Sequence, residues 1–457
     1  MSRGQQGIGI SAAGMYGQLT TGNSTRIFSK VKGSKTAHRI EVQIDTRSNK
    51  PTVLADEEFD WMPVFHPVKL DGNPGKDIPY KHGTCVSIEM EAAYVRGRLS
   101  VDEYLKQCAI VNPHLALHYS LTLKPKAEPK LETGNSKLAK DKEAKADAGQ
   151  GSNFKFQVSY ERAVTKLPAP PTEIKPHPHG VELGILMQML KDSTARTLSG
   201  ALSTDFSRVS DKSAKEICDR AKLNPKANPT RIAHQESEAL YKAIQDTKLM
   251  RPPTDCLSPI GEAAIIAGLK KEIEADFYTA VTREPEVYRG NPFQIEVGIA
   301  YAKPDPKQEI GAEEPARVMR FANRVPLLYQ AGACAVSEAV TSVNWKSYGL
   351  SQPKDGLPLG PMVILVHMAS VWVPFTSESK EAIAHYAEII KEMTFALQEC
   401  GRQLSVYLSR RRREAEAARK RNYIELYIPH LALGLKEILD LDDRQEKSII
   451  NKLSKML

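Results

Sequence analysis

The chain has 457 residues, and its 41% hydrophobic and 26% charged residues are typical of a globular protein with buried cores. No apolar run approaches the ~18 residues of a membrane span and no signal peptide opens the chain, so we expect a cytoplasmic protein with no membrane partner. The net charge of +8 permits contact with nucleic acid without demonstrating it.

The length allows about three domains at roughly 150 residues each. The six cysteines include no Cys-x-x-Cys pair, which argues against a zinc site and against a disulfide framework. We therefore expect buried, reduced thiols.

The chain begins with a glycine-rich segment, Gly4-Gln5-Gln6-Gly7-Ile8-Gly9-Ile10-Ser11, which leads into the helix-like stretch 12–19. Glycines allow backbone N–H groups to crowd around an anion, and a helix directs its positive dipole end to the same place. The spacing excludes a P-loop and a dinucleotide fingerprint, because the P-loop lysine and the preceding strand are missing. An ordinary loop at a helix entry is the alternative.

The next region mixes strands and helices. Alternating patterns predict strands at 38–45, 83–90 and 118–123, and Ser100 with an acidic first turn predicts a helix start. Residues 124–150 are rich in Lys, Glu, Asp, Ala and Gly, so they cannot bury enough apolar surface to offset chain entropy. We expect a disordered insertion there, with a solvated charged helix as the alternative.

Helical, polar-basic sequence follows from about 181 to 269. It is preceded by His177-Pro178-His179, whose two imidazoles have no Cys or acidic partner at metal spacing, so a plain loop is favoured. Strand alternation returns at 293–300, and the almost entirely apolar run 362–368 predicts a central strand covered on both faces.

A second candidate element, Gln352-Pro353-Lys354, stands in a tight polar loop just before that central strand. A lysine on a loop could supply a mobile positive charge to the outermost phosphate of a nucleotide. An ordinary surface lysine is the alternative. Together with the glycine-rich segment, this lysine suggests a nucleotide site built from two domains.

A long helix is predicted to start near Ser377, because apolar residues follow at steps of three and four along one stripe. It continues into Arg410–Arg413 and Arg419–Arg421, which are interpreted as a solvated face rather than a DNA clamp. A last pair of helical segments is predicted at 431–439 and 442–456.

Six blocks of this sequence, in order along the chain, resemble the B subunits of type IIB DNA topoisomerases (topoisomerase VI, archaeal type). The first, 4–22, is similar to the second glycine box of their Bergerat (GHKL-type) ATP-binding fold. The blocks are 4–22, 109–114, 176–182, 252–262, 320–329 and 373–381.

This resemblance implies an α+β multidomain fold. Residues 1–180 would be a partial GHKL/Bergerat ATP-binding domain, 181–270 a helix-two-turn-helix domain, 271–421 a transducer domain with an α/β core and a long helix, and 422–457 a helical segment contacting the A subunit. The ATP-binding residues would be Gly4–Ser11 around the phosphates and Lys354 at the γ-phosphate.

In that family, two A and two B subunits form a heterotetramer. The A subunits carry the tyrosine and the magnesium site that cut double-stranded DNA. The B subunits bind ATP with Mg²⁺, dimerise, and couple their closure to passage of a second duplex through the break. The resemblance therefore implies a nucleoid-associated isomerase that relaxes supercoils and decatenates DNA.

One departure from the family pattern concerns the start of the ATPase domain. The family places a magnesium-binding Asn, a general-base Glu and an Asp-x-Gly-x-Gly box ahead of this glycine box, and only three residues precede Gly4 here. We therefore expect a protein that lacks the first part of this domain, through a split gene, a wrong start or a natural truncation. Such a chain is expected to leave a sheet edge unpaired and not to hydrolyse ATP alone, because no base can activate water.

Two other functions stay open at this point. One is a non-catalytic DNA-binding or assembly fragment of the same family, without ATPase activity, and the DNA upstream of the gene would distinguish it from the enzyme component. The other is a different Bergerat-fold ATPase, such as a mismatch-repair or chaperone relative. The block 252–262 and the helical region before it argue against that relative.

Overall fold

The computed structural model describes residues 9–45, 50–65, 78–95, 97–123, 154–302, 314–439 and 442–455. They belong to two compact units, Arg3–Leu167 and Pro168–Leu457, which are described separately. Both units mix helices and strands, so the predicted α+β class is confirmed. Residues 4–8 and the insertion predicted at 124–150 lie outside the described residues.

The first unit contains a helix on an antiparallel sheet of four strands in the order β3-β2-β1-β6. The strands predicted at 38–45 and 83–90 are confirmed as β2 and β6, and α1 packs on β1 and β2. The elements are α1 (Gly9–Thr21), β1 (Thr25–Lys30), β2 (Ala37–Asp45), β3 (Lys50–Phe59) and β6 (Gly83–Ser87).

Two glycines allow α1 to lie directly against its neighbours. A Cβ on Gly14 would lie 2.7 Å from the Thr25 hydroxyl oxygen, and one on Gly17 would lie 2.6 Å from the Glu89 carbonyl oxygen. The Gln18 amide then exchanges hydrogen bonds with the backbone N–H and carbonyl of Ile44, at 2.8 and 3.1 Å. These glycines therefore serve packing, a role distinct from phosphate binding.

The rest of the first unit comprises β4 (Val64–Phe65), β5 (Ile78–Pro79), α2 (Val101–Val111), β7 (Leu117–Leu123) and β8 (Phe154–Tyr160). The predicted helix start is confirmed, because the Ser100 hydroxyl accepts the Glu103 N–H at 3.2 Å. The Asp102 carboxylate accepts hydrogen bonds from the hydroxyls of Tyr94 and Tyr119, which ties α2 to β7.

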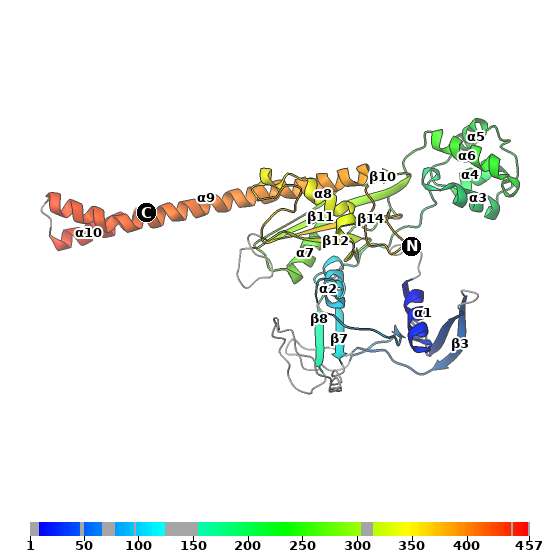
Figure 1. Ribbon diagram of the computed structural model, residues 1–457, viewed down its shortest axis with the longest axis horizontal. Coiled ribbons are helices and arrows are strands. Elements are labelled where there is room, and N and C mark those ends of the chain that lie inside the picture. The colour runs from blue at the N-terminus through cyan, green and yellow to red at the C-terminus, as the bar shows by residue number, and fades with distance from the viewer. Residues whose placement is uncertain are drawn as a thin grey trace, which may run out of the picture. The chain divides into compact units, whose positions relative to one another are not determined.

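The second unit starts with a bundle of four helices and two short 3₁₀ turns, seen as one cluster in Figure 1. Its helices share a single apolar core, as α5 illustrates with buried Ala214, Ile217 and Cys218 on one face. The elements are η1 (Pro178–Gly180), α3 (Leu183–Asp192), α4 (Leu198–Asp205), α5 (Asp211–Arg220), η2 (Pro229–Arg231) and α6 (His234–Asp246).

A mixed sheet follows, with the strand order β10-β11-β14-β12-β13 and β9 also paired to β11. The strand predicted at 362–368 is confirmed as β14, which runs antiparallel to β11 and parallel to β12 and is buried at every residue. The strands are β9 (Phe277–Thr282), β10 (Glu286–Tyr288), β11 (Asn291–Tyr301), β12 (Arg317–Ala322), β13 (Val325–Pro326) and β14 (Met362–Ser370).

Helices cover both faces of this sheet (Figure 1). On one face, odd-numbered residues of β11 such as Ile295 and Val297 join the core formed with α8 (Ala335–Ser342) and α9 (Ala387–Leu439). On the other face, Gly298 lies so close to α7 (Glu262–Glu272) that an added Cβ would be 2.5 Å from Ile265. Helix α7 thus packs on the sheet and not in the four-helix core.

The long helix is confirmed, but two of its predicted limits are wrong. It begins at Ala387, ten residues after Ser377. The chain between them folds back on itself: Phe375 forms a β-bridge with Ile383, and the Ala384 N–H donates to the Pro374 carbonyl at 2.7 Å. These backbone groups are therefore not available for a helix. It also continues through Pro429 to Leu439, so 431–439 is no separate helix.

The chain then turns back into α10 (Asp443–Lys455), which packs along the end of α9 as a helical hairpin (Figure 1). Ile428 and Ala432 of α9 are buried there, on either side of Pro429. This packing accounts for the uninterrupted helix, because proline in a helix interior ordinarily costs about 3 kcal/mol and needs such compensation.

The predicted buried thiols are found at Cys218, Cys256, Cys334 and Cys400, whereas Cys85 is exposed. Burial raises the pKa of the Cys400 thiol, so this group stays neutral in the core. No helix in the described part of the chain combines the length and the apolar composition that a bilayer span needs.

Two glycines of α9 offer a matched test of how tightly this helix packs. A Cβ on Gly401 would lie 2.7 Å from the Tyr348 ring, whereas nothing lies within 4 Å of one on Gly434. Gly434→Ala should raise stability by about 1 kcal/mol through helix propensity. Gly401→Ala would gain the same helix propensity, but its Cβ would crowd the Tyr348 ring. Such overpacking costs about 1–3 kcal/mol, so the Tm should fall. Thermal unfolding of both variants checks this, and equal shifts would contradict the close contact.

Candidate functional site

The loop that carries Lys354 is a tight turn between η4 (Trp345–Tyr348) and β14. Asp355 adopts a positive φ of 53°, and the Gly356 N–H donates to the Pro353 carbonyl at 3.2 Å. Lys354 is exposed at the tip, and no described residue pairs with its ammonium group. The loop therefore presents one unneutralised cation on a well-defined backbone.

Gln352 fixes this loop to the body of the domain. Its side-chain oxygen accepts the Trp345 N–H at 3.0 Å, and its amide nitrogen donates to the carbonyls of Thr341 and Gly356 at 3.2 and 3.0 Å. Because the amide oxygen and nitrogen reach three backbone groups, they hold the base of the loop to the end of α8 and to η4.

The 3₁₀ turn η4 contacts the long helix α9. The Trp345 indole is buried and donates to the Val340 carbonyl at 2.8 Å, while the Tyr348 ring packs on Gly401. Further along α9, the Arg412 guanidinium donates to the Gly349 carbonyl at 2.7 Å. A continuous series of contacts therefore links the Lys354 loop to α9.

The glycine-rich segment is only partly described. Gly9, Ile10 and Ser11 form the exposed first turn of α1, which contains no acidic residue, and space around Gly9 is open. The N–H groups of a first helical turn have no partner within the helix, which suits an anion. Gly4, Gln5, Gln6, Gly7 and Ile8 lie outside the described residues, so their role stays a prediction.

Two motif blocks of the second unit, 252–262 and 320–329, come together around a wholly buried carboxylate, that of Glu296 on β11. It accepts the backbone N–H groups of Ile260 and Gly261, both at 2.7 Å, the Thr282 hydroxyl at 3.0 Å and Nδ1–H of His367 at 2.8 Å. The other ring nitrogen of His367 accepts the Arg324 N–H at 3.0 Å, which identifies a neutral imidazole protonated at Nδ1.

Two buried arginines extend this network. Arg324 donates to the Pro259 carbonyl at 2.8 Å, and Arg320 donates to the carbonyls of Leu327 and Tyr329 at 2.7 and 2.8 Å. Blocks 252–262 and 320–329 are thus joined through structural hydrogen bonds. Sequence reasoning missed Glu296 and His367, although an acidic residue and a histidine in otherwise apolar strands were the available signal.

The two histidines before the helical bundle lie at the 3₁₀ turn η1 and form hydrogen bonds to backbone carbonyls. His177 bonds to the Met250 carbonyl at 3.0 Å, and His179 bonds to the carbonyls of Ile244 and Thr247 at 3.0 and 3.1 Å. No group of three or more His, Cys, Asp or Glu side chains in the described ranges has the geometry to hold a metal ion.

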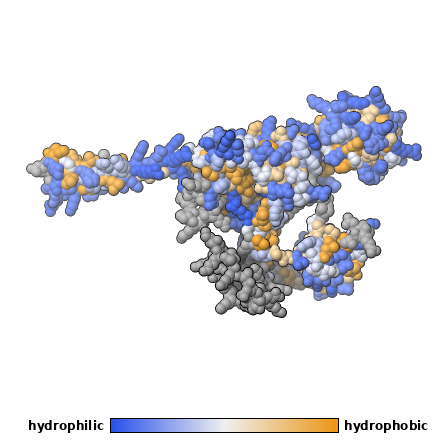
Figure 2. All heavy atoms as spheres, viewed as in Figure 1, coloured by the Kyte–Doolittle hydropathy of each residue, from blue (hydrophilic) through white to orange (hydrophobic). Residues whose placement is uncertain are grey.

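The arginine run on α9 has two separate roles. Arg411 approaches Asp276 at 3.6 Å and lies over the Tyr407 ring, and Arg412 binds Gly349, so both hold α9 to the body. Arg410 pairs with Glu414 at i,i+4 spacing in an exposed position, which fits the predicted solvated face. In Figure 2 this part of α9 is the hydrophilic stretch ahead of the hairpin.

Beyond this stretch, the α9–α10 hairpin exposes apolar side chains, visible as orange atoms at its end in Figure 2. Leu426 and Ile438 are 71% and 79% exposed, and the rings of Tyr423 and Tyr427 are in contact, tilted by 43° with centroids 4.8 Å apart. Such a cluster of aromatic and aliphatic groups on one element is typical of a protein interface. The exposed apolar residues are Tyr423, Ile424, Leu426, Tyr427, Leu431, Leu433, Leu435, Ile438 and Leu439.

Comparisons with known proteins agree with these features. The family profile described as "Topoisomerase VI B subunit, transducer" matches residues 252–420, which contain the mixed sheet, the Lys354 loop and most of α9. The B subunit of type 2 DNA topoisomerase 6 from Methanococcoides burtonii is 44% identical over 442 residues, covering 96% of this chain and 62% of the relative. That from Methanosarcina barkeri is 42% identical, covering 99% and 64%.

The corresponding protein of Pyrococcus horikoshii is 32% identical, with 95% of this chain and 74% of the relative covered. The profile match identifies residues 252–420 as a topoisomerase VI-type transducer region. The chain belongs to the family of type 2 DNA topoisomerase 6 B subunits, and it spans slightly less than two thirds of the length of the first two relatives. The B subunit of Myxococcus xanthus DNA gyrase is a distant structural match, at 16% identity and a TM-score of 0.19 over 28% of this chain and 34% of that one, and supports no argument.

The Glu296 network predicts a pH-dependent contribution to stability. Burial alone would raise the pKa of this carboxyl, but the N–H groups of His367, Ile260 and Gly261 hold it below its usual value. A lowered pKa in the folded state gives stability that is present above the ordinary pKa of about 4.3 and is lost as the pH falls through the folded value.

Glu296→Gln should therefore lower the free energy of unfolding by about 2 kcal/mol at pH 7, because a buried N–H is left facing the amide. Its deficit relative to the unaltered chain should shrink as the pH falls below about 4, where the carboxyl becomes protonated in the unfolded chain while it is still charged in the fold. Urea unfolding at several pH values measures this, with exposed Glu416→Gln as the control. A deficit independent of pH would show that Glu296 is not charged in the fold.

Proposed function

We propose that this chain functions in an ATP-dependent type II DNA topoisomerase as its B subunit, which drives passage of one duplex through a break made by the A subunit. The observation that carries the proposal is the exposed Lys354 on a loop whose anchor, Gln352, leads through η4 to the long helix. A cation that meets a nucleotide at one end of such a series can move a helix at the other.

The nucleotide in this proposal is ATP, held by Gly4–Ser11 in the first unit and by Lys354 in the second. ATP with Mg²⁺ supplies the triphosphate charge and the energy of hydrolysis. The residues of this chain bind and orient: the first-turn N–H groups of α1 attract phosphate oxygens, and Lys354 neutralises the outermost one. Neither the first-turn N–H groups of α1 nor Lys354 alone neutralises the charge of a triphosphate, so nucleotide binding favours the arrangement in which both make contact.

The proposed domain limits follow the sequence expectation of nucleotide binding over 1–180, a helix-two-turn-helix domain over 181–270, a transducer over 271–421 and a partner segment over 422–457. Helix α7 is the exception, and we assign it to the transducer because it packs on the sheet. Two copies of this chain and two A subunits would form an A2B2 assembly on double-stranded DNA. Its action would be relaxation of supercoils and decatenation.

Lys354→Ala, tested in a complex that contains the A subunit and also supplies the upstream ATPase segment with the general-base Glu, should reduce ATP-dependent relaxation of supercoiled DNA at least about tenfold. Its Tm should change little, because an exposed lysine with no described partner contributes little to stability. Exposed Lys391→Ala removes the same charge from α9 and should keep normal activity. Relaxation at the normal rate by Lys354→Ala would contradict the assignment.

The partner surface is proposed to be the exposed apolar side of the α9–α10 hairpin. Truncation after Arg421 should abolish co-purification with the A subunit. The sheet core should stay folded, because the described contacts of α9 with the body end at Arg412. Leu426→Glu with Ile438→Glu should weaken capture at least about tenfold without shortening the chain, because burying two carboxylates in an apolar contact is costly. Pull-down with the tagged A subunit measures both, and unchanged affinity would locate the interface elsewhere.

A further inference from the structure

Helix α10 presents a continuous polar-basic face that the apolar partner surface does not use. The members of this face follow each other at steps of three and four, so they share one side of the helix. All are polar or cationic, and together they line a shallow groove of about 460 Å³. They are Arg444, Lys447, Ser448, Asn451, Lys452 and Lys455.

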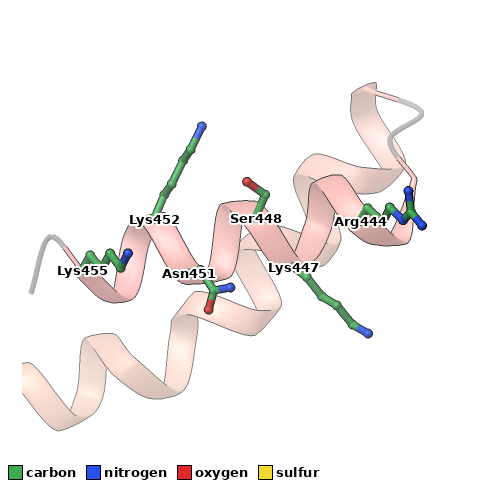
Figure 3. Close-up of a pocket in the computed structure, with 6 residues that line it drawn as sticks. All are labelled: Arg444, Lys447, Ser448, Asn451, Lys452 and Lys455. Atoms are coloured by element: carbon green, nitrogen blue, oxygen red, sulfur yellow. The ribbon is translucent and has the colours of Figure 1, made fainter.

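Figure 3 shows how this face is arranged. Lys447 and Lys452 stand at the two edges of this face and point away from each other, and Ser448 and Asn451 occupy the surface between them. The face runs from Arg444 to Lys455, which is about 16 Å along a helix. Its side chains are hydrogen-bond donors or cations throughout, and no apolar residue belongs to it.

The acidic residues of α10 do not hold the cations of this face in ion pairs, although Lys447 helps to lower the pKa of the Asp443 carboxyl. The acidic residues of α10, Asp443 and Glu446, both bind Lys436 of α9, the latter at 2.8 Å. These bonds keep the pKa of Lys436 raised and the pKa of Asp443 lowered, so both groups remain charged. None of the four cations of the groove forms an ion pair with a residue in 442–455 or in the other described ranges.

We propose that this face of α10 binds the phosphate backbone of double-stranded DNA, independently of sequence. The cations of this face lie in a row along the helix, with hydroxyl and amide donors between them, and this arrangement suits the regularly spaced phosphates of DNA. Such groups make most of the contacts between proteins and the DNA backbone. A protein partner would need an apolar centre, which the hairpin offers on its α9 side and not here. The proposal deepens the proposed topoisomerase function and rests on it for its biological setting.

The test uses the full chain and a fluorescent duplex of about 20 base pairs, with anisotropy measured at several salt concentrations. Lys447→Ala with Lys452→Ala should lower affinity by on the order of tenfold or more at about 0.1 M salt and reduce the slope of log K against log[salt] by about 1.8. Lys32→Ala with Lys35→Ala, which removes the same charge from an exposed turn of the first unit, should leave both unchanged. The α10 variant leaves the Lys436 bonds intact, and circular dichroism verifies its helix content.

Capture of the tagged A subunit is measured on the same variants. Reduced DNA binding with normal capture supports the proposal. Unchanged affinity and slope overturn it, and so does loss of capture with normal DNA binding, which would make the face a protein contact. Failure of the unaltered chain to capture the A subunit would count against the proposed function alone, because the DNA measurement needs only this chain.

Discussion

The buried Glu296 carboxylate is the interaction on which the second unit depends most. A charge in a core is tolerated only when hydrogen bonds replace the water it has lost, and Glu296 receives them from β9, β14 and the segment before α7. These elements belong to different parts of the chain. Their positions around one carboxylate therefore fix both how α7 enters and how β11 and β14 are aligned.

The Lys354 loop, in the same unit, is built by ordinary packing. Gln352 and Trp345 connect it to α8, and Tyr348 and Arg412 connect η4 to α9. The lysine itself is the least constrained member of the series, because its side chain is exposed while its backbone is held. This division suits a group that must meet a ligand without altering the fold that presents it.

Much of this architecture was accessible from the sequence, because strong periodicity reports burial directly. The apolar run of β14 and the stripe of α9 were correctly identified for that reason. The start of α9 was not, since the return at Phe375–Ile383 depends on backbone pairing between distant segments. Continuation through Pro429 was likewise missed, because it depends on α10 packing back, which no local pattern contains. The hydrogen bond between Glu296 and His367 could not be predicted from either residue alone, because it requires the pairing of β11 with β14.

The attachment points of α9 have a mechanical consequence. Arg412 is the most distal residue of the helix with a described hydrogen bond to the body, and α9 continues to Leu439. At 1.5 Å per residue, about 40 Å of helix lies beyond that point. A rotation of about 5° at this point would displace the far end by about 3.5 Å. With this geometry, a small adjustment near the Lys354 loop would become a movement large enough to open or close a contact at the end of α9.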